Sequence, residues 1–167
     1  RHVIVHHGRK KVCVLTGPEN TPVAEQRLSV FLDEIRQLGI TVPAELVRYG
    51  DFWYSGGEQL ADDIADGRIS RPEAVICGSD HMALGLINRL ISRGIRVPED
   101  IRITGYDGDT EARMHSPAIT TYQTSQRRLG IEAACRLLTA ITGTESKPCA
   151  AESGRLNCRE SCGCDSR

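Results

Sequence analysis

Aromatic residues, net charge and long apolar runs are all scarce in this sequence. Phe, Trp and Tyr make up 4% of its 167 residues, and 21 Lys and Arg against 22 Asp and Glu leave a formal net charge of −1. That balance lacks the basic surplus by which proteins bind nucleic acid or an anionic membrane. No apolar stretch approaches the roughly 20 residues that a transmembrane helix requires. We therefore expect a globular chain of one domain, or at most two small ones, with no membrane partner.

Sequence motifs of common enzymes are also missing. The chain has no phosphate-binding G-x-x-x-x-G-K-[ST] loop and no G-x-G-x-x-G motif, and residues 78–80 lack the G-x-S-x-G context of a hydrolase nucleophile. A catalytic histidine needs a second group that orients it. Three histidines lie in the irregular start and two stand alone: His2, His6, His7, His81 and His115. We expect no catalytic residue, no cofactor and no enzyme activity.

The seven cysteines fall into two groups. Three lie inside apolar segments, where a cysteine behaves as a small buried hydrophobe, and four crowd the tail: Cys149, Cys158, Cys162 and Cys164. The pattern is not a disulfide framework and favours a reducing cytosol. Cys158-x3-Cys162 has a spacing found in zinc or iron sites, but thiolate sites usually show two such pairs. We therefore favour free or incidentally oxidised thiols and expect no metal, with the metal site kept as the alternative.

Strand-like and helix-like segments alternate along most of the chain. Short apolar runs at 11–16, 45–49, 74–77 and 101–106 predict strands, with 119–122 extended and 155–159 as a last strand. Apolar residues at helical spacing predict helices between Thr21 and Gly39, from a capping box at Ser55 to Gly67, from Ser79 or Asp80 to Gly94, and over 126–142. This alternation predicts an α/β fold, a parallel sheet with helices on both faces.

Ligands of such sheets bind outside the carboxyl ends of the strands. Segments 17–18, 50–52, 78–80 and 106–107 should lie at that edge. Asp80, Asp107 and Asp109 fall there and fit several roles: metal ligand, catalytic carboxylate, helix cap or hydrogen-bond acceptor. Aromatic residues 52–54 lie at the same edge, where a ring can cover the apolar face of a sugar or base, although at least one of the three should fill the core.

Three segments together resemble the effector-binding region of the LacI/GalR family of bacterial transcription regulators. They read Ala-Val-Ile-Cys-Gly-Ser-Asp-His-Met-Ala-Leu-Gly at 74–85, Gly-Ile-Arg-Val-Pro-Glu-Asp-Ile at 94–101 and Thr-Gly-Tyr-Asp at 104–107. Thr16-Gly17-Pro18 and the Ser-Pro-Ala-Ile-Thr-Thr run at 116–121 also match the family pattern. The resemblance covers nearly the whole chain in order.

The resemblance implies a periplasmic-binding-protein-like fold with two lobes and a small-molecule cleft between them. Residues 11–122 would form the C-terminal lobe, 123–145 a crossover helix toward the other lobe, and 146–167 a closing strand and cysteine-rich tail. The chain begins on Arg1 without a signal-peptide pattern, so we expect a fragment or a processed product. The cysteine usage favours a cytoplasmic protein. We expect it to sense a small molecule, namely a carbohydrate, and DNA would be bound only by a helix-turn-helix outside these residues. The alternative is a periplasmic sugar-binding protein of a transporter or sensor.

Family ligand contacts carry over to five positions. Arg27 matches an arginine that reaches the cleft, Phe52 a stacking aromatic and Asp107 an acidic contact at a strand end. Ser79 stands where the family usually has Asn, and Thr124 where it usually has Gln, so the effector need not be a well-known sugar or purine.

Two expectations concern apolar helix faces. Leu84, Ile87 and Ile91 lie on a helix that resembles a family dimer element, which predicts a homodimer through residues 81–93. The other face belongs to the helix at 126–142, and it carries Leu129, Ala133, Leu137 and Ile141. This face would meet the missing lobe, so we expect the helix to fold onto the chain's own surface, to be mobile, or to pack against another copy.

Overall fold

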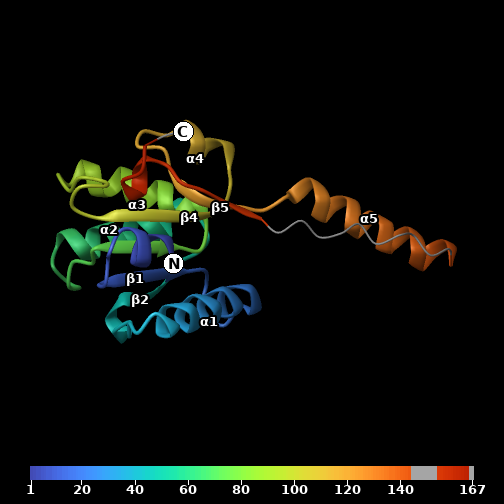
Figure 1. Ribbon diagram of the computed structural model, residues 1–167, viewed down its shortest axis with the longest axis horizontal. Coiled ribbons are helices and arrows are strands. Elements are labelled where there is room, and N and C mark those ends of the chain that lie inside the picture. The colour runs from blue at the N-terminus through green and yellow to red at the C-terminus, as the bar shows by residue number, and fades with distance from the viewer. Residues whose placement is uncertain (144–153, 166–167) are drawn as a thin grey trace.

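The computed structural model describes residues 1–143 and 154–165, so Cys149 lies outside the described residues. Six strands form one sheet in the order β2-β1-β3-β4-β5-β6 (Figure 1). The strands are β1 (Val12–Thr16), β2 (Val47–Tyr49), β3 (Ala74–Cys77), β4 (Arg102–Asp107), β5 (Thr120–Gln123) and β6 (Arg155–Asn157). The first five are parallel, which confirms the predicted sheet, and β6 returns antiparallel to β5.

Within the described part of the chain, five α-helices lie between successive strands, and there are also three short helical turns. The α-helices are α1 (Pro22–Gln37), α2 (Tyr54–Ala65), α3 (Asp80–Ser92), α4 (Thr110–Met114) and α5 (Gln126–Thr142). The turns are η1 (His2–His6), η2 (Ala44–Leu46) and η3 (Glu160–Cys162). The predicted start of α2 is wrong, because Ser55 lies inside the helix and is not its N-cap residue. Asp51 accepts hydrogen bonds from the Trp53 and Gly56 N–H groups, and the helix therefore begins before Ser55.

One face of the sheet is covered by α2 and α3, which pack closely on each other. Gly57 makes this possible, because a Cβ there would lie 2.0 Å from the Met82 carbonyl oxygen of α3. Leu84 and Ile87 are buried in this layer, with relative exposures of 1% and 0%. The predicted dimer face on α3 is therefore wrong for these two residues: they pack inside the domain, and Ile91 remains exposed.

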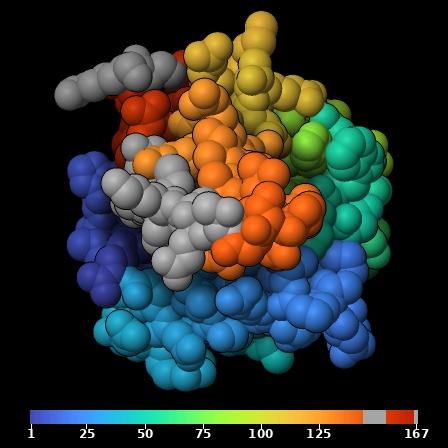
Figure 2. All heavy atoms as spheres, turned by 90° about the vertical axis from the view of Figure 1, so that its right-hand side faces the viewer, coloured from blue at the N-terminus to red at the C-terminus, as the bar shows by residue number. Residues whose placement is uncertain are grey.

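The opposite face is covered by α1 and by segments from both ends of the sequence. Val3 and Ile4 of η1 pack with Leu28 and Ile35 of α1 in a second apolar cluster that also includes Cys162. This arrangement confirms helices on both faces of the sheet. Figure 2 shows the N-terminal segment in blue beside the red C-terminal segment.

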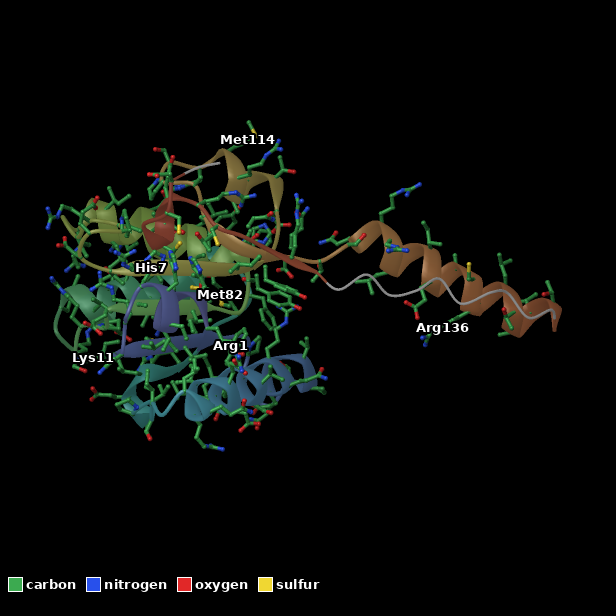
Figure 3. All side chains as sticks on the ribbon, viewed as in Figure 1. Arg1, His7, Lys11, Met82, Met114 and Arg136 are labelled. Carbon is green, nitrogen blue, oxygen red and sulfur yellow. The ribbon has the colours of Figure 1, made fainter. Side chains whose placement is uncertain are left out.

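Helix α5 projects away from the sheet and its covering helices (Figure 1). No residue of α5 is buried, and Leu129, Leu137 and Ile141 are 59%, 61% and 71% exposed. In Figure 3 the labelled Arg136 lies far from the rest of the labelled side chains. The expectation that α5 folds onto the chain's own surface is therefore wrong, because the loop after β5 directs the helix outward. Within residues 1–143 and 154–165, no helix has the length and apolar character needed to cross a bilayer.

Candidate functional site

Arg27 connects three elements at the carboxyl edge of the sheet. Its Nη1 donates a hydrogen bond to the Gly78 carbonyl after β3, and its Nη2 lies 3.6 Å from Asp107 Oδ1 at the end of β4. The helix α1 thus places a guanidinium group beside a strand-end carboxylate. The structure brings together Arg27 and Asp107, two of the residues that the resemblance indicated.

Aromatic rings surround the Arg27 guanidinium. Its Cζ atom lies 4.3 Å from the centre of the Tyr106 ring and 5.3 Å from that of Phe52. Both separations suit a cation over a ring face. Tyr106 in turn stacks on Tyr122 of β5 at 5.5 Å between ring centres. The arrangement combines a cation with apolar ring surfaces at one edge.

Phe52 is held in place by the turn after β1. A Cβ at Gly17 would lie 2.1 Å from the Phe52 ring, so only glycine leaves room for the ring there. Phe52 itself has φ of 62°, in the left-handed region that non-glycine residues rarely adopt. This strained backbone directs the ring over Gly17 and toward Arg27.

The carboxyl group of Asp107 binds its proton unusually tightly. Its pKa is raised to about 6, chiefly by burial and also by the neighbouring carboxylates of Asp80 and Asp109, whereas Arg27 and His81 oppose the shift. Asp107 has φ of 120°, which turns its side chain out of the regular strand direction. Its acceptor strength will therefore depend on pH close to neutrality.

Asp80 positions the loop that follows Asp107. It is fully buried, and its Oδ2 accepts hydrogen bonds from the N–H groups of Gly108 and Asp109 at 2.9 and 2.8 Å. Burial raises the pKa of Asp80, and bonds from Thr121 and these backbone groups counteract the shift. Of the roles that the sequence left open for Asp80, the structure supports that of a hydrogen-bond acceptor inside the protein.

Ser79 also has a positioning role. Its Oγ accepts from the Met82 N–H as the N-cap of α3 and donates to the Phe52 carbonyl, both at 3.2 Å. Only 3% of Ser79 is exposed, and both of these hydroxyl contacts lie within the chain. It acts on the site through the backbone of Phe52.

Thr124 follows β5 next to the Asp107 segment. Its backbone N–H donates to the Asp107 carbonyl oxygen at 3.3 Å, and the residue is half-buried. The structure thus brings Arg27, Phe52, Asp107 and Thr124 to one edge, with Ser79 beneath them.

The sequence placed Tyr106 at this edge but did not indicate a ligand contact for Tyr106 or for His81. The His81 ring stacks on Trp53 at 4.6 Å, and its Nδ1 lies 3.5 Å from Asp109 Oδ2. Tyr54 donates to Glu111 at 2.6 Å, and this bond with burial raises its pKa to about 12. The position of Tyr106 next to Asp107 at a strand end was the available signal, because adjacent strand-end residues share an edge.

The chemistry of this edge is that of non-covalent recognition. Asp107 can accept hydrogen bonds, Arg27 can donate them, and Phe52 and Tyr106 offer ring faces. Such a combination of few polar groups with aromatic surface is typical of small-molecule sites.

Comparison with known proteins also indicates a small-molecule-binding domain. Residues 2–162 match the family model described as a periplasmic binding protein-like domain. A PurR transcriptional repressor of Vibrio vulnificus is 35% identical over 142 residues, which cover 85% of this chain and 42% of that protein. The CytR repressor of Escherichia coli is 31% identical over 140 residues, covering 84% and 41%.

Solved structures agree with this result. A LacI-family sugar-binding transcriptional regulator from Escherichia coli, complexed with phosphate, has a TM-score of 0.85 at 25% identity and covers 98% of this chain and 58% of its own. The complex of the regulator CelR with cellobiose has a TM-score of 0.84 at 30% identity, covering 95% and 48%.

The chain belongs to the periplasmic binding protein-like domain family, and it represents part of a LacI/GalR-type effector-binding domain. It spans about two fifths of the length of the curated relatives that it matches. These relatives are transcriptional repressors, not enzymes.

Proposed function

We propose that this chain is the C-terminal, effector-sensing lobe of a cytoplasmic transcriptional regulator. One observation carries the proposal: Arg27, Phe52 and Asp107 come from three separate segments and meet at the carboxyl edge of the sheet. In this reading, residues 11–122 form the lobe and 123–145 the crossover toward a second lobe. A separate helix-turn-helix binds DNA, and a homodimer responds to the effector by a shift between two lobe arrangements.

The exposed stripe of α5 supports this division. Leu129, Leu137 and Ile141 are each more than half exposed, which is unfavourable by roughly 25 cal/mol for every Å² of apolar surface left in water. A second lobe would cover this surface, as the resemblance implies. The homodimer rests on the family resemblance, since α3 buries two of the three residues first assigned to the interface.

The effector class follows from the groups at the edge. Asp107 accepts from hydroxyl or ring N–H groups, Arg27 donates, and Phe52 covers an apolar face, which suits a carbohydrate. A relative of this chain was solved with cellobiose, which makes this disaccharide a reasonable first probe.

Titration of the isotope-labelled chain with cellobiose, followed by NMR, tests the site. We expect millimolar binding, because one lobe buries only part of a ligand, with amide shifts at Gly17, Gly78 and Asp107. A purine nucleoside is the second probe. Arg27→Gln should weaken the binding of the active probe at least tenfold, whereas Arg36→Gln, on the exposed side of the same helix, should not.

Absence of shifts at this edge with either probe, or equal loss for the two arginine variants, contradicts the proposed site. In the longer protein, Asp107→Ala should abolish the effector response and leave operator binding intact. An unchanged effector titration would remove Asp107 from the site.

The alternative function is a periplasmic sugar-binding protein, which shares the fold and the cleft. The repressors among the relatives favour the regulator. The gene sequence upstream of Arg1 would distinguish the two, because the regulator predicts a helix-turn-helix there and the periplasmic protein predicts a signal peptide.

A further inference from the structure

Four metal-binding side chains meet at the amino edge of the sheet, opposite the candidate effector site. His2 and His7 come from the N-terminal segment, and Cys162 and Cys164 from the C-terminal segment. One ligand atom from each lies within 4.8 Å of all the others. Figure 3 labels His7 close to the sheet, and Figure 2 shows the blue and red segments side by side.

The separations within this Cys2His2 cluster suit a tetrahedral metal ion. His2 Nε2 lies 3.1 Å from His7 Nε2 and 3.4 Å from the Sγ atoms of Cys162 and Cys164, and Cys164 Sγ lies 3.4 Å from His7 Nε2. Zinc bonds of about 2.0–2.1 Å to nitrogen and about 2.3 Å to sulfur place tetrahedral ligands about 3.3–3.8 Å apart. Four of the six separations therefore lie within a few tenths of an ångström of the tetrahedral values, and the other two are no longer than 4.8 Å.

Local backbone geometry aims each pair of ligands at the same point. The π-helical turn η1 closes through a hydrogen bond from the His7 N–H to the His2 carbonyl, which brings these two rings onto one side. Gly163 has φ of 85°, and this left-handed turn lets both cysteines of Cys162-Gly163-Cys164 face the histidines.

Two neighbouring side chains, Thr120 and Cys158, contact the ligand residues Cys162 and His2. Thr120 Oγ1 lies 2.9 Å from Cys162 Sγ and can donate to a thiolate there. Cys158 Sγ lies 3.8 Å from His2 Nδ1, the ring nitrogen left free when Nε2 binds metal. Outer contacts of this kind fix ring orientation and tune affinity in known metal sites.

We propose that His2, His7, Cys162 and Cys164 bind one structural Zn²⁺ ion that ties the N-terminal segment to the C-terminal segment. Two thiolates and two neutral imidazoles neutralise the ion, and four protein ligands leave no open position for catalysis. An open cavity of about 1050 Å³, lined by His2, His7 and Cys164 among others, gives the ion a path from solvent. The sequence showed only one thiolate pair of suitable spacing, Cys158-x3-Cys162. The two histidines that complete the cluster lie more than 150 residues away along the chain.

Arg102 is the group that opposes the site. Its Nη1 lies 3.0 Å from His7 Nδ1 and also donates to the Cys162 carbonyl. A metal-bound His7 carries its hydrogen on Nδ1, so the guanidinium must give up this contact and keep the carbonyl. Arg102→Gln should therefore raise zinc affinity, because the amide oxygen can accept from Nδ1–H and a positive charge is removed.

The test uses the reduced full chain, stripped of metal by a chelator and titrated with Co²⁺ in the absence of air. We expect one equivalent to give the visible absorption of a tetrahedral cobalt–thiolate centre, and Zn²⁺ to abolish it. Cys164→Ser and His7→Gln should each lower zinc affinity at least about 100-fold, and Cys158→Ser about 10-fold. Cys135→Ser and His115→Gln, away from the cluster, are the matched controls and should leave it unchanged.

Circular dichroism of each metal-free variant shows whether it still folds. Cys162 is fully buried, so the half-buried Cys164 and His7 are the more informative positions. No tetrahedral cobalt spectrum from the wild-type chain, or equal loss of affinity in the control variants, overturns the proposal.

Discussion

Helices α3 and α5 carry similar apolar patterns but have opposite environments. In α3, eight residues are buried: Asp80, Met82, Ala83, Leu84, Gly85, Leu86, Ile87 and Leu90. In α5 no residue is buried, although leucine and isoleucine recur along it at helical spacing. An apolar stripe therefore predicts a helix and a covered face, but not what covers that face. For α3 the cover is α2 in the same domain, whereas none of the described residues buries the stripe of α5.

The largest expected effect comes from truncating a buried leucine of α3. Leu86→Ala should lower the free energy of unfolding by about 3 kcal/mol, because a fully buried side chain is replaced by a cavity. The matched change in α5, Leu137→Ala, should alter it by less than about 0.5 kcal/mol. Urea denaturation at neutral pH measures both. A comparable loss for Leu137 would show that α5 is covered by something in solution.

The next effect concerns the contact between α2 and α3. Gly57→Ala should lower the free energy of unfolding by about 2 kcal/mol, since the new Cβ would lie 2.0 Å from the Met82 oxygen and 2.6 Å from the Leu86 nitrogen. Both atoms belong to the backbone of α3, so the two helices must move apart. Gly67, with no atom near its would-be Cβ but φ of 72°, is unsuitable as a control. An unchanged urea midpoint would mean that the two helices pack less closely than described.

The third prediction concerns the candidate site: the stability of the chain should depend on pH through Asp107. The folded chain holds the Asp107 proton more tightly than the unfolded chain, so the wild type loses stability as the pH rises from about 4 to about 6. Asp107→Asn cannot ionise and should gain stability relative to the wild type by on the order of 1–2 kcal/mol between pH 4.5 and 7.5. The expected gain is smaller than the full pKa shift would give, because the Asp107 side chain is 26% exposed and solvent screens its charge.

Urea denaturation at the two pH values measures this difference. Asp33→Asn, on the exposed surface of α1, controls for the loss of a carboxylate. A relative stability of Asp107→Asn that stays constant with pH would show that Asp107 is not held as an acid of raised pKa. A gain in stability with a loss of ligand response would identify Asp107 as a residue kept for function.

Much of the fold followed from the sequence because each strand–helix unit is locally consistent. The helix predicted over 126–142 coincides with α5, and residues 74–77 form β3 as expected. The five-residue α4 is too short to show a helical period. The antiparallel pairing of β6 depends on the chain returning along β5, which a local pattern does not contain.

For the candidate site, the sequence predicted the edge of the sheet on which it lies but not the contacts of each side chain. The strand-end rule indicated Asp107 and the resemblance indicated both Asp107 and Arg27, and the structure shows an ion pair between these two residues. The rule and the resemblance could not show that Ser79 is buried as a cap, because the same residue type serves as cap or ligand contact. The Cys2His2 cluster could not be predicted for a different reason: its histidines and its cysteines lie near opposite ends of the sequence, and only folding brings them together.

The smallest effect tests whether α5 is independent of the domain. Gly130 lies within α5, and no atom lies within 4 Å of a Cβ built there. Gly130→Ala should favour the helix by about 0.5–1 kcal/mol. If no part of the domain contacts α5, this gain cannot reach the global unfolding equilibrium. Hydrogen exchange within α5 should then slow severalfold while the urea midpoint stays constant. A rise of the midpoint that matches the local gain would show that α5 unfolds together with the sheet, and so that its apolar stripe is covered in solution.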